Sequence, residues 1–239
     1  MRKVCCQIQG CKTDFPDWNN GMKVEIIRHI KDFLLPQQCA GCHTWDEGPL
    51  CSDCFQTLEL VDEHQLQETP SGLAVFGLLN FTGIVREILH AAKYQGEVWR
   101  LQGLCDAIFE CIPVTPILTQ ASVVVAVPGD PWRTWTRGYN PPQIIARSVA
   151  KWLNISEIST LIRRRNGGVA QQTLSLSDRT KRYDDDTFVP NRSPVGIATE
   201  SSVIVVDDIV TTGATIRANV RALERMGLHA IPVGLCIGG

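Results

Sequence analysis

The sequence has no apolar run approaching the roughly 18 residues that a membrane-spanning helix requires. It also lacks the apolar core of a secretion signal, because Met1, Arg2 and Lys3 are followed by the polar stretch CCQIQGCKTDF. A strong excess of one charge is absent too, since the formal net charge is -2. These absences argue against a membrane-spanning or secreted protein, and we expect a cytoplasmic one.

The residues that are present are typical of a compact fold. Of 239 residues, 44% are hydrophobic and 20% are charged, which excludes a chain that is disordered throughout. A single body of this size buries roughly 70% of the surface that the unfolded chain exposes. The chain is therefore long enough to form a substantial hydrophobic core.

The small net charge conceals an uneven distribution along the chain. The segment from Pro131 to Arg182 holds ten Lys or Arg residues and two acids, a net charge of +8, which leaves -10 for the remainder. A basic segment of this kind favours a polyanionic ligand or a nucleic acid. The alternative is a basic face that is only solvated.

Ten cysteines would indicate disulfides in a secreted chain, but here the spacing favours a metal site. Cys39, Cys42, Cys51 and Cys54 form two Cys-x-x-Cys pairs separated by eight residues. Four thiolates in this pattern close a tetrahedral site for a structural zinc ion, whose binding would supply the folding energy of so short a segment. The alternatives are a redox pair or unligated buried cysteines, and we expect His43 to be a bystander. No comparable pattern links the remaining cysteines, which are Cys5, Cys6, Cys11, Cys105, Cys111 and Cys236.

The chain divides into four expected parts. Residues 1–35 form an N-terminal extension and a helix, 36–60 a zinc ribbon, 61–72 a linker, and 73–239 an α/β domain. The helix begins at Met22, where apolar residues recur at helical spacing. The sequence leaves open whether translation starts at Met1 or at Met22.

From residue 73 onward, apolar runs and amphipathic segments alternate as in an α/β protein. Strands are expected over 73–81, 121–127, 158–162, 201–208 and 229–237, and helices over 83–94, 97–112, 140–153, 175–183 and 215–227. The last strand, turn, helix and strand form a right-handed crossover unit. Its ligand side lies at the carboxyl ends of the strands.

A candidate ligand site follows the strand over 201–208. Asp207 and Asp208 end that strand, and the small-residue turn from Thr211 to Thr215 opens the next helix. Backbone N–H groups and the positive end of a helix dipole bind phosphate, whereas carboxylates accept hydrogen bonds from sugar hydroxyls. The segment therefore suits a ligand with a phosphate at one end and a polyol at the other. A purely structural origin is the alternative.

The stretch VIVVDDIVTTGAT resembles the phosphoribosyl-pyrophosphate signature of type I phosphoribosyltransferases. The resemblance implies that Asp207 and Asp208 hold the ribose hydroxyls, and that the turn holds the 5′-phosphate. It also implies that VPGDPWRTWTRGYN is the pyrophosphate loop, with Lys93 able to neutralise a ligand phosphate; a solvated lysine at a helix end is the alternative. The residues that the resemblance places at the 5′-phosphate and in the pyrophosphate loop are Thr211, Thr212, Gly213, Ala214, Thr215, Arg133, Arg137, Gly138, Tyr139 and Asn140.

The order of motifs resembles the ComF/GntX family over residues 22–239. In chain order these motifs are CAGC, CSDC, AAKYQG, QQTLSLSDR and the signature. The sequence departs from the family pattern at Pro141, where Gln is frequent, and at Arg182, where Asn is common. The resemblance implies a type I phosphoribosyltransferase-like parallel sheet flanked by helices, with a small N-terminal zinc ribbon. It also implies a role in DNA uptake during natural competence, or in the use of external DNA.

Two functions remain open, and whether the chain is an enzyme is uncertain. A phosphoribosyltransferase would use Mg²⁺ with phosphoribosyl pyrophosphate, but no segment indicates an acceptor base. A binding module would hold single-stranded DNA and work with the DNA-uptake machinery. Its phosphate contacts and stacking residue would be Arg133, Arg137, Arg163, Arg164, Arg165 and Trp135, with Trp132 as a further stacking residue. A transcriptional regulator is a weaker alternative, because no helix-turn-helix pattern is found.

Overall fold

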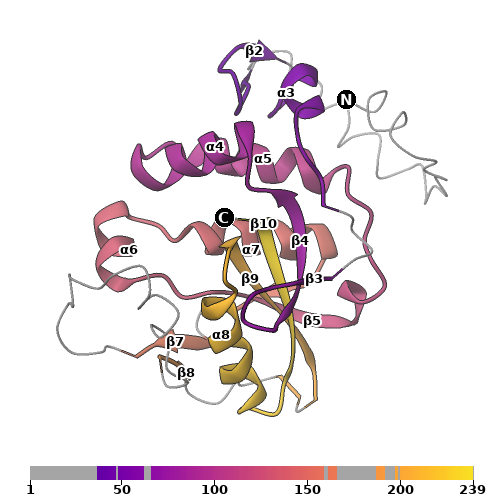
Figure 1. Ribbon diagram of the computed structural model, residues 1–239, viewed down its shortest axis with the longest axis vertical. Coiled ribbons are helices and arrows are strands. Elements are labelled where there is room, and N and C mark those ends of the chain that lie inside the picture. The colour runs from indigo at the N-terminus through magenta and orange to yellow at the C-terminus, as the bar shows by residue number, and fades with distance from the viewer. Residues whose placement is uncertain are drawn as a thin grey trace.

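The computed structural model describes residues 37–46, 48–61, 66–158, 161–165, 187–191, 197–198 and 200–238 (Figure 1). The expected N-terminal helix, its start at Met22, the expected helix over 175–183 and Arg182 lie outside these residues. No helix in the described ranges is both long and apolar enough to cross a bilayer.

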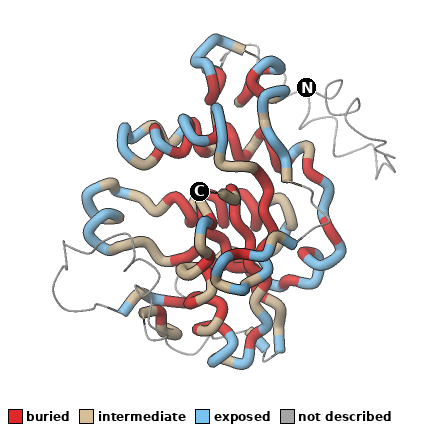
Figure 2. The backbone as a smooth tube through the Cα atoms, viewed as in Figure 1, coloured by how far each residue is buried: buried red, intermediate tan, exposed pale blue. Residues whose placement is uncertain are grey.

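A six-stranded sheet with the order β3-β4-β10-β9-β5-β6 forms the centre of the molecule. Its strands are β3 (Gln67–Glu68), β4 (Ala74–Asn80), β5 (Ala121–Ala126), β6 (Ser156–Glu157), β9 (Ser202–Val210) and β10 (His229–Ile237). All neighbouring strands are parallel except β3, which pairs antiparallel with β4. The long strands are buried on both faces, which explains why they read as continuous apolar runs (Figure 2).

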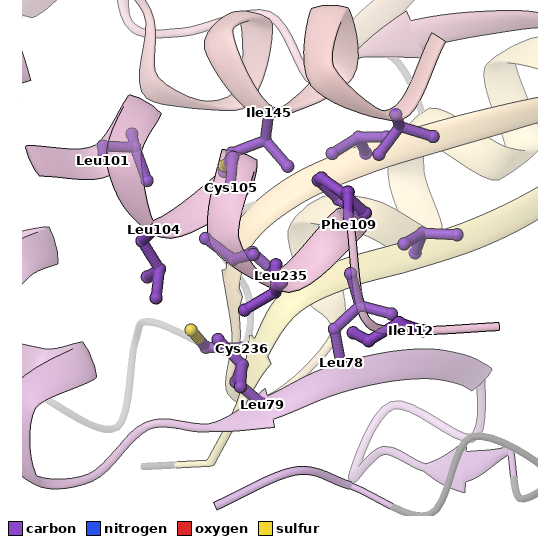
Figure 3. Close-up of a cluster of buried hydrophobic side chains, with 14 of the residues drawn as sticks. Leu78, Leu79, Leu101, Leu104, Cys105, Phe109, Ile112, Ile145, Leu235 and Cys236 are labelled. Atoms are coloured by element: carbon purple, nitrogen blue, oxygen red, sulfur yellow. The ribbon is translucent and has the colours of Figure 1, made fainter. Parts of the chain in front are cut away.

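Alternate residues of β5 and β9 pack into two separate cores. Val124 and Ile204 belong to a cluster with helices α4 (Gly83–Tyr94), α5 (Val98–Phe109) and α7 (Pro141–Leu153), part of which Figure 3 shows. Val123 and Val203 belong to a second cluster with helix α8 (Ala214–Glu224). The period of two along a strand thus sends successive side chains to opposite faces, and helices cover both.

The ribbon, residues 37–46 and 48–56, consists of the antiparallel pair β1 (Gln37–Gln38) and β2 (Trp45–Asp46) followed by α3 (Ser52–Gln56). It lies above α4 and α5 in Figure 1. Arg100 of α5 is only 6% exposed and donates from Nε to the Ala40 carbonyl at 2.6 Å and from Nη2 to the Gly41 carbonyl at 2.9 Å. Because Ala40 belongs to the same core cluster as α5, the ribbon packs as part of this face of the domain.

Three segments differ from the sequence-based expectation. The stretch expected to be a pyrophosphate loop contains a helix, α6 (Pro131–Arg137), because Asp130 caps its first turn, Pro131 occupies its first position and Gly138 ends it at φ 83. The short strand β3 and its turn fall within the range expected for a linker. The expected strand over 158–162 is replaced by β6 and by β7 (Ile162–Arg164), which pairs with β8 (Phe188–Pro190).

Candidate phosphate site and cysteine cluster

Strand β9 carries Asp207 and Asp208 to the carboxyl edge of the sheet, between β5 and β10. Asp207 is 8% exposed and lies opposite Gly234 of β10. The backbone N–H of Asp208 donates to Asp207 Oδ1 at 2.9 Å, and the N–H of Ile209 donates to Asp208 Oδ1 at 2.8 Å. Both carboxyl groups are therefore held by the backbone that follows them.

The two carboxyl groups differ in their surroundings. Burial, and secondarily the charge of Asp208, raises the pKa of Asp207 to about 7, although the Asp208 N–H and the charge of Lys93 act in the opposite direction. Asp208 instead has a direct cationic partner, since its Oδ2 lies 2.8 Å from Lys93 Nζ. At neutral pH Asp207 is thus close to its titration midpoint, and can both donate and accept hydrogen bonds with a hydroxylated ligand.

Lys93, one of the residues singled out from the sequence, is placed by residues of the expected pyrophosphate loop. Arg137 Nε donates to the Lys93 carbonyl at 2.9 Å, and the Tyr139 hydroxyl donates to the carbonyl of Ala92. These bonds fasten the end of α4 to the end of α6. Lys93 consequently projects to Asp208 and is not a solvated lysine at a helix end.

The turn from Thr211 to Gly213 brings the N-terminus of α8 to this edge. Gly213 has φ 75, a backbone conformation that favours glycine. A Cβ at this position would also lie 2.4 Å from Thr69 Oγ1, so there is no room for a side chain. The Ser71 N–H donates to the Thr212 carbonyl at 3.0 Å, and Arg217 Nη1 donates to the Ser71 carbonyl at 2.8 Å. The turn before α8 is therefore held by contacts with the segment that contains Thr69 and Ser71.

Sequence reasoning missed these supporting residues. Thr69 and Ser71 stand in the turn TPSG, whose composition is that of a linker, and the signal available was only a turn motif. Arg217 looked like an ordinary exposed position of an amphipathic helix. Helix α8 begins at Ala214, one residue before the expected start at Thr215, and the Ala214 N–H lies 3.4 Å from Thr212 Oγ1.

Helix α6 carries an exposed aromatic pair. The rings of Trp132 and Trp135 are 5.3 Å apart between centroids, and both side chains are exposed with Arg133 between them in the sequence. Behind the helix, Asn140 Nδ2 donates to the Val127 carbonyl at 2.9 Å, which fixes the segment to the end of β5. The helix thus exposes two aromatic rings and a positive charge, and its C-terminal side is held to the end of β5.

Two residues that were singled out from the sequence, Arg164 and Lys93, both contact helix α6 or its cap. Arg164 of β7 lies 3.6 Å from Asp130, the residue that caps α6, whereas Arg137 at the other end of α6 contacts Lys93. Arg163 and Arg165 flank Arg164 and are exposed. Helix α6 therefore adjoins β7 at its first end, through Asp130, and the carboxylate site at its other end, through Arg137 and Lys93.

The four predicted metal ligands lie together in the ribbon. The Sγ atoms of Cys39, Cys42, Cys51 and Cys54 are all within 4.8 Å of one another, and those of Cys42 and Cys51 are 3.7 Å apart. Tetrahedral zinc with Zn–S bonds of about 2.3 Å requires sulfurs about 3.8 Å apart. The N–H groups of Gly41 and Cys51 point to Cys39 Sγ at 3.3 and 3.2 Å, as in a metal-binding knuckle. The cluster therefore fits a single metal ion.

The thiols of this cluster differ in acidity before any ion is bound. Hydrogen bonds from Thr44 lower the pKa of Cys42 to about 6, whereas burial raises the pKa of Cys51 and of Cys54. A bound cation compensates the ionisation of buried thiols, so metal binding releases protons from them. His43 lies outside the four-sulfur group, and its ring packs edge-on against Trp99 at 5.6 Å, as expected of a bystander.

Known proteins resemble this chain over most of its length. The family model described as phosphoribosyl transferase domain matches residues 137–237. Competence protein F of Haemophilus influenzae is 23% identical over 205 residues, which cover 82% of this chain and 87% of that protein. DNA utilization protein YhgH of Salmonella typhi is 31% identical over 175 residues, which cover 70% of this chain and 73% of that protein. Adenine phosphoribosyltransferase from Saccharomyces cerevisiae is 14% identical, with coverage of 78% and 86% and a TM-score of 0.37.

Proposed function

Since the chain belongs to the ComF/GntX family, with relatives named competence protein F and DNA utilization protein YhgH, we propose that it acts in the uptake or utilisation of external DNA. In this role it binds phosphoribosyl pyrophosphate at the carboxyl edge of the sheet and single-stranded DNA along α6. The observation that carries the proposal is the set of contacts at the end of β9, where Lys93 of α4 pairs with Asp208, Arg137 of α6 donates to the Lys93 carbonyl, and β9 continues into the turn before α8. Each of these segments supplies a group suited to a phosphorylated sugar.

Phosphoribosyl pyrophosphate matches the groups at this edge. The backbone N–H groups that open α8 bind the 5′-phosphate, and Asp207 and Asp208 accept hydrogen bonds from the ribose hydroxyls. The diphosphate lies toward Lys93 and Arg137, where positive charge is concentrated. Carboxylate oxygens are suitable ligands for Mg²⁺, which would neutralise part of the diphosphate charge when bound.

Single-stranded DNA matches the outer surface of α6. Exposed Trp132 and Trp135 offer faces on which bases stack, and the exposed Arg133 follows Trp132 in the same helix. The basic segment 163–165 lies beside this helix, because Arg164 of β7 adjoins the start of α6, whereas Arg163 and Arg165 are exposed and alternate with Arg164 along the chain. A strand along this path contacts phosphates through Arg133, Arg163 and Arg165, without base-specific contacts.

The cysteine cluster binds one structural zinc ion in this proposal. All four positions of a tetrahedral site are taken by cysteines, so no position is left open for a catalytic water. Zinc binding therefore serves to fold the ribbon, which then packs on α5 through Arg100.

Phosphoribosyl transfer in nucleotide metabolism is the second candidate. Lys93 lies next to Asp208, where positive charge stabilises a departing pyrophosphate, and this favours turnover. The acceptor base is not indicated by any described residue. The test is pyrophosphate release from phosphoribosyl pyrophosphate and Mg²⁺ in the presence of each common nucleobase. No release above the protein-free rate would leave binding as the role of this site.

Calorimetry with phosphoribosyl pyrophosphate tests the ligand site. We expect Asp208→Asn to weaken binding of the sugar phosphate, whereas Thr212→Val also weakens binding of inorganic phosphate. The matched control is Glu87→Gln, an exposed position of α4, which should leave both affinities unchanged. Equal affinities for all four proteins would refute the site.

A salt titration of oligothymidylate binding tests the DNA surface. Each phosphate contact contributes about 0.7 to the slope of log affinity against log salt, so Arg133→Gln should flatten that slope by about 0.7. Trp135→Ala should instead cost about 1 to 3 kcal/mol at an unchanged slope. The control Arg86→Gln, exposed on α4, should change neither. If oligothymidylate affinity does not change with salt or with any of these substitutions, this surface is not the DNA-binding site.

A further inference from the structure

A groove that the proposed function does not use lies between the ribbon and α5. It is an open cavity of about 470 Å³ that Gln38, Trp45 and Pro49 line from the ribbon, and Trp99, Gln102 and Asp106 from α5. Trp45 is 67% exposed and Trp99 is 40% exposed. Two indole rings on separate elements thus present apolar faces to the same opening.

The groove is formed in advance of any ligand. Arg100 ties the ribbon backbone to α5, and a methyl group at Gly103 would lie 3.0 Å from Ala40 Cβ, so the two parts touch closely beneath the groove. His43 meets Trp99 edge-on at an interplanar angle of 84°. Packing therefore positions the Trp99 ring, and the docked ribbon holds the backbone that carries Trp45, so a ligand would not have to bring the two walls together.

Among the described residues that line the groove, Asp106 alone is charged. Asp106 accepts a hydrogen bond from Gln102 Nε2 at 3.0 Å and forms no ion pair with any residue in the described ranges. The lining residues include neither lysine nor arginine. A carboxylate beside indole faces is the combination that attracts an organic cation, because the ring quadrupole and the charge act in the same sense.

We propose that this groove is a docking site for a basic protein segment, which inserts a lysine or arginine side chain between Trp45 and Trp99 and pairs it with Asp106. The aliphatic part of such a side chain covers the indole faces, and its charged end reaches the carboxylate. The groove lies on the ribbon side of α5. The protein partner and the nucleic acid therefore occupy different surfaces.

A nucleic acid strand is the less suitable occupant of this groove. Bases could stack on the two indoles, but no cationic side chain lines the groove to contact a phosphate, and Asp106 would repel one. Phosphate contacts supply most of the affinity in non-specific nucleic acid binding. The charge of the groove thus favours the basic peptide.

Fluorescence anisotropy with a labelled hexalysine peptide, and hexaglutamate as its acidic counterpart, tests the proposal on the full-length protein. We expect hexalysine to bind and hexaglutamate not to bind. Trp99→Ala and Asp106→Asn should each weaken hexalysine binding roughly 5- to 30-fold. The matched controls are Tyr94→Ala, which removes an exposed aromatic ring of α4, and Glu87→Gln, which removes an exposed carboxylate of α4; both should bind as the unmodified protein does.

Side-chain indole N–H signals provide a second measurement that does not require a variant to remain folded. Adding hexalysine should shift the signals of Trp45 and Trp99 but not those of Trp132 and Trp135. Equal losses of hexalysine affinity in the groove and control variants, or unshifted Trp45 and Trp99 signals, would overturn the proposal. Loss of oligothymidylate binding in Trp99→Ala with hexalysine binding retained would overturn it in favour of a nucleic acid.

Discussion

Asp207→Asn should stabilise the protein at high pH, although it removes a group of the ligand site. The wild-type carboxyl is buried, and its pKa is raised from 3.8 to about 7. Between these two pH values the unfolded chain has released its proton while the folded chain retains it. The free energy of unfolding therefore falls as the pH rises through this window, and the penalty is complete above pH 7.

The size of the effect follows from the same two values. A difference of about three pH units at 1.36 kcal/mol each corresponds to about 4 kcal/mol well above pH 7. About 1 to 2 kcal/mol of this is already present at pH 5. The asparagine keeps the oxygen that accepts from the Asp208 N–H, but it buries an amide, which adds a cost that does not depend on pH. The stability difference between variant and wild type should thus grow by about 2 to 3 kcal/mol from pH 5 to pH 8.

Urea unfolding at half-unit steps of pH, followed by circular dichroism, measures this difference. Asp53→Asn, an exposed position of the ribbon, serves as the control and should show no such growth. Lys93→Met removes a charge that lowers the pKa of Asp207, so it should move the pH dependence to higher pH. A stability difference for Asp207→Asn that stays constant from pH 5 to pH 8 would refute the burial argument.

Three other changes test the supports of the site and ribbon. Arg100→Met should lower the free energy of unfolding by about 3 kcal/mol, because the Ala40 and Gly41 carbonyls lose their donors, whereas the exposed Arg86→Met should not; urea titration compares them. Gly213→Ala should destabilise the protein more than Gly72→Ala, because both glycines have positive φ but only a Cβ at position 213 would clash with Thr69. Thermal unfolding measures the difference in stability, and calorimetry with phosphate measures the effect on binding. Cys42→Ser with Cys54→Ser should abolish a zinc content of about one per chain by metal analysis, and wild type without zinc after growth in zinc-replete medium would contradict the ribbon.

Local patterns predicted much of the fold and the signature. The helix over 83–94 has the predicted bounds in α4 because its apolar residues repeat at helical spacing within twelve residues. Asp207 to Thr215 could be recognised for a similar reason, since the strand end, turn and helix start are contiguous. The sequence also contains cues for α6 in Asp130, Pro131 and Gly138, within the stretch that resembles the pyrophosphate loop.

Contacts between distant segments could not be predicted in this way. Arg100 reads as one charged residue on an amphipathic helix, and its acceptors stand 59 and 60 residues earlier in the chain. The pairing of Lys93 with Asp208 likewise depends on how α4 packs against the sheet. Trp45 and Trp99 form one groove only because the ribbon docks on α5. Each of these contacts depends on tertiary packing, which sequence periodicity does not encode.

The docking of the ribbon on α5 sets an order of events during synthesis. The last ribbon cysteine, Cys54, precedes Arg100 and Gly103 in the chain, so the ribbon leaves the ribosome before the surface that receives it. At about 5 to 20 residues per second this interval lasts seconds. A segment this short has no core of its own, so under the proposed zinc site an ion held by its four thiols would have to keep it folded through that interval. The proposed zinc site thus implies that metal supply during translation, and not only in the finished protein, would determine how much of the nascent chain reaches its docked form.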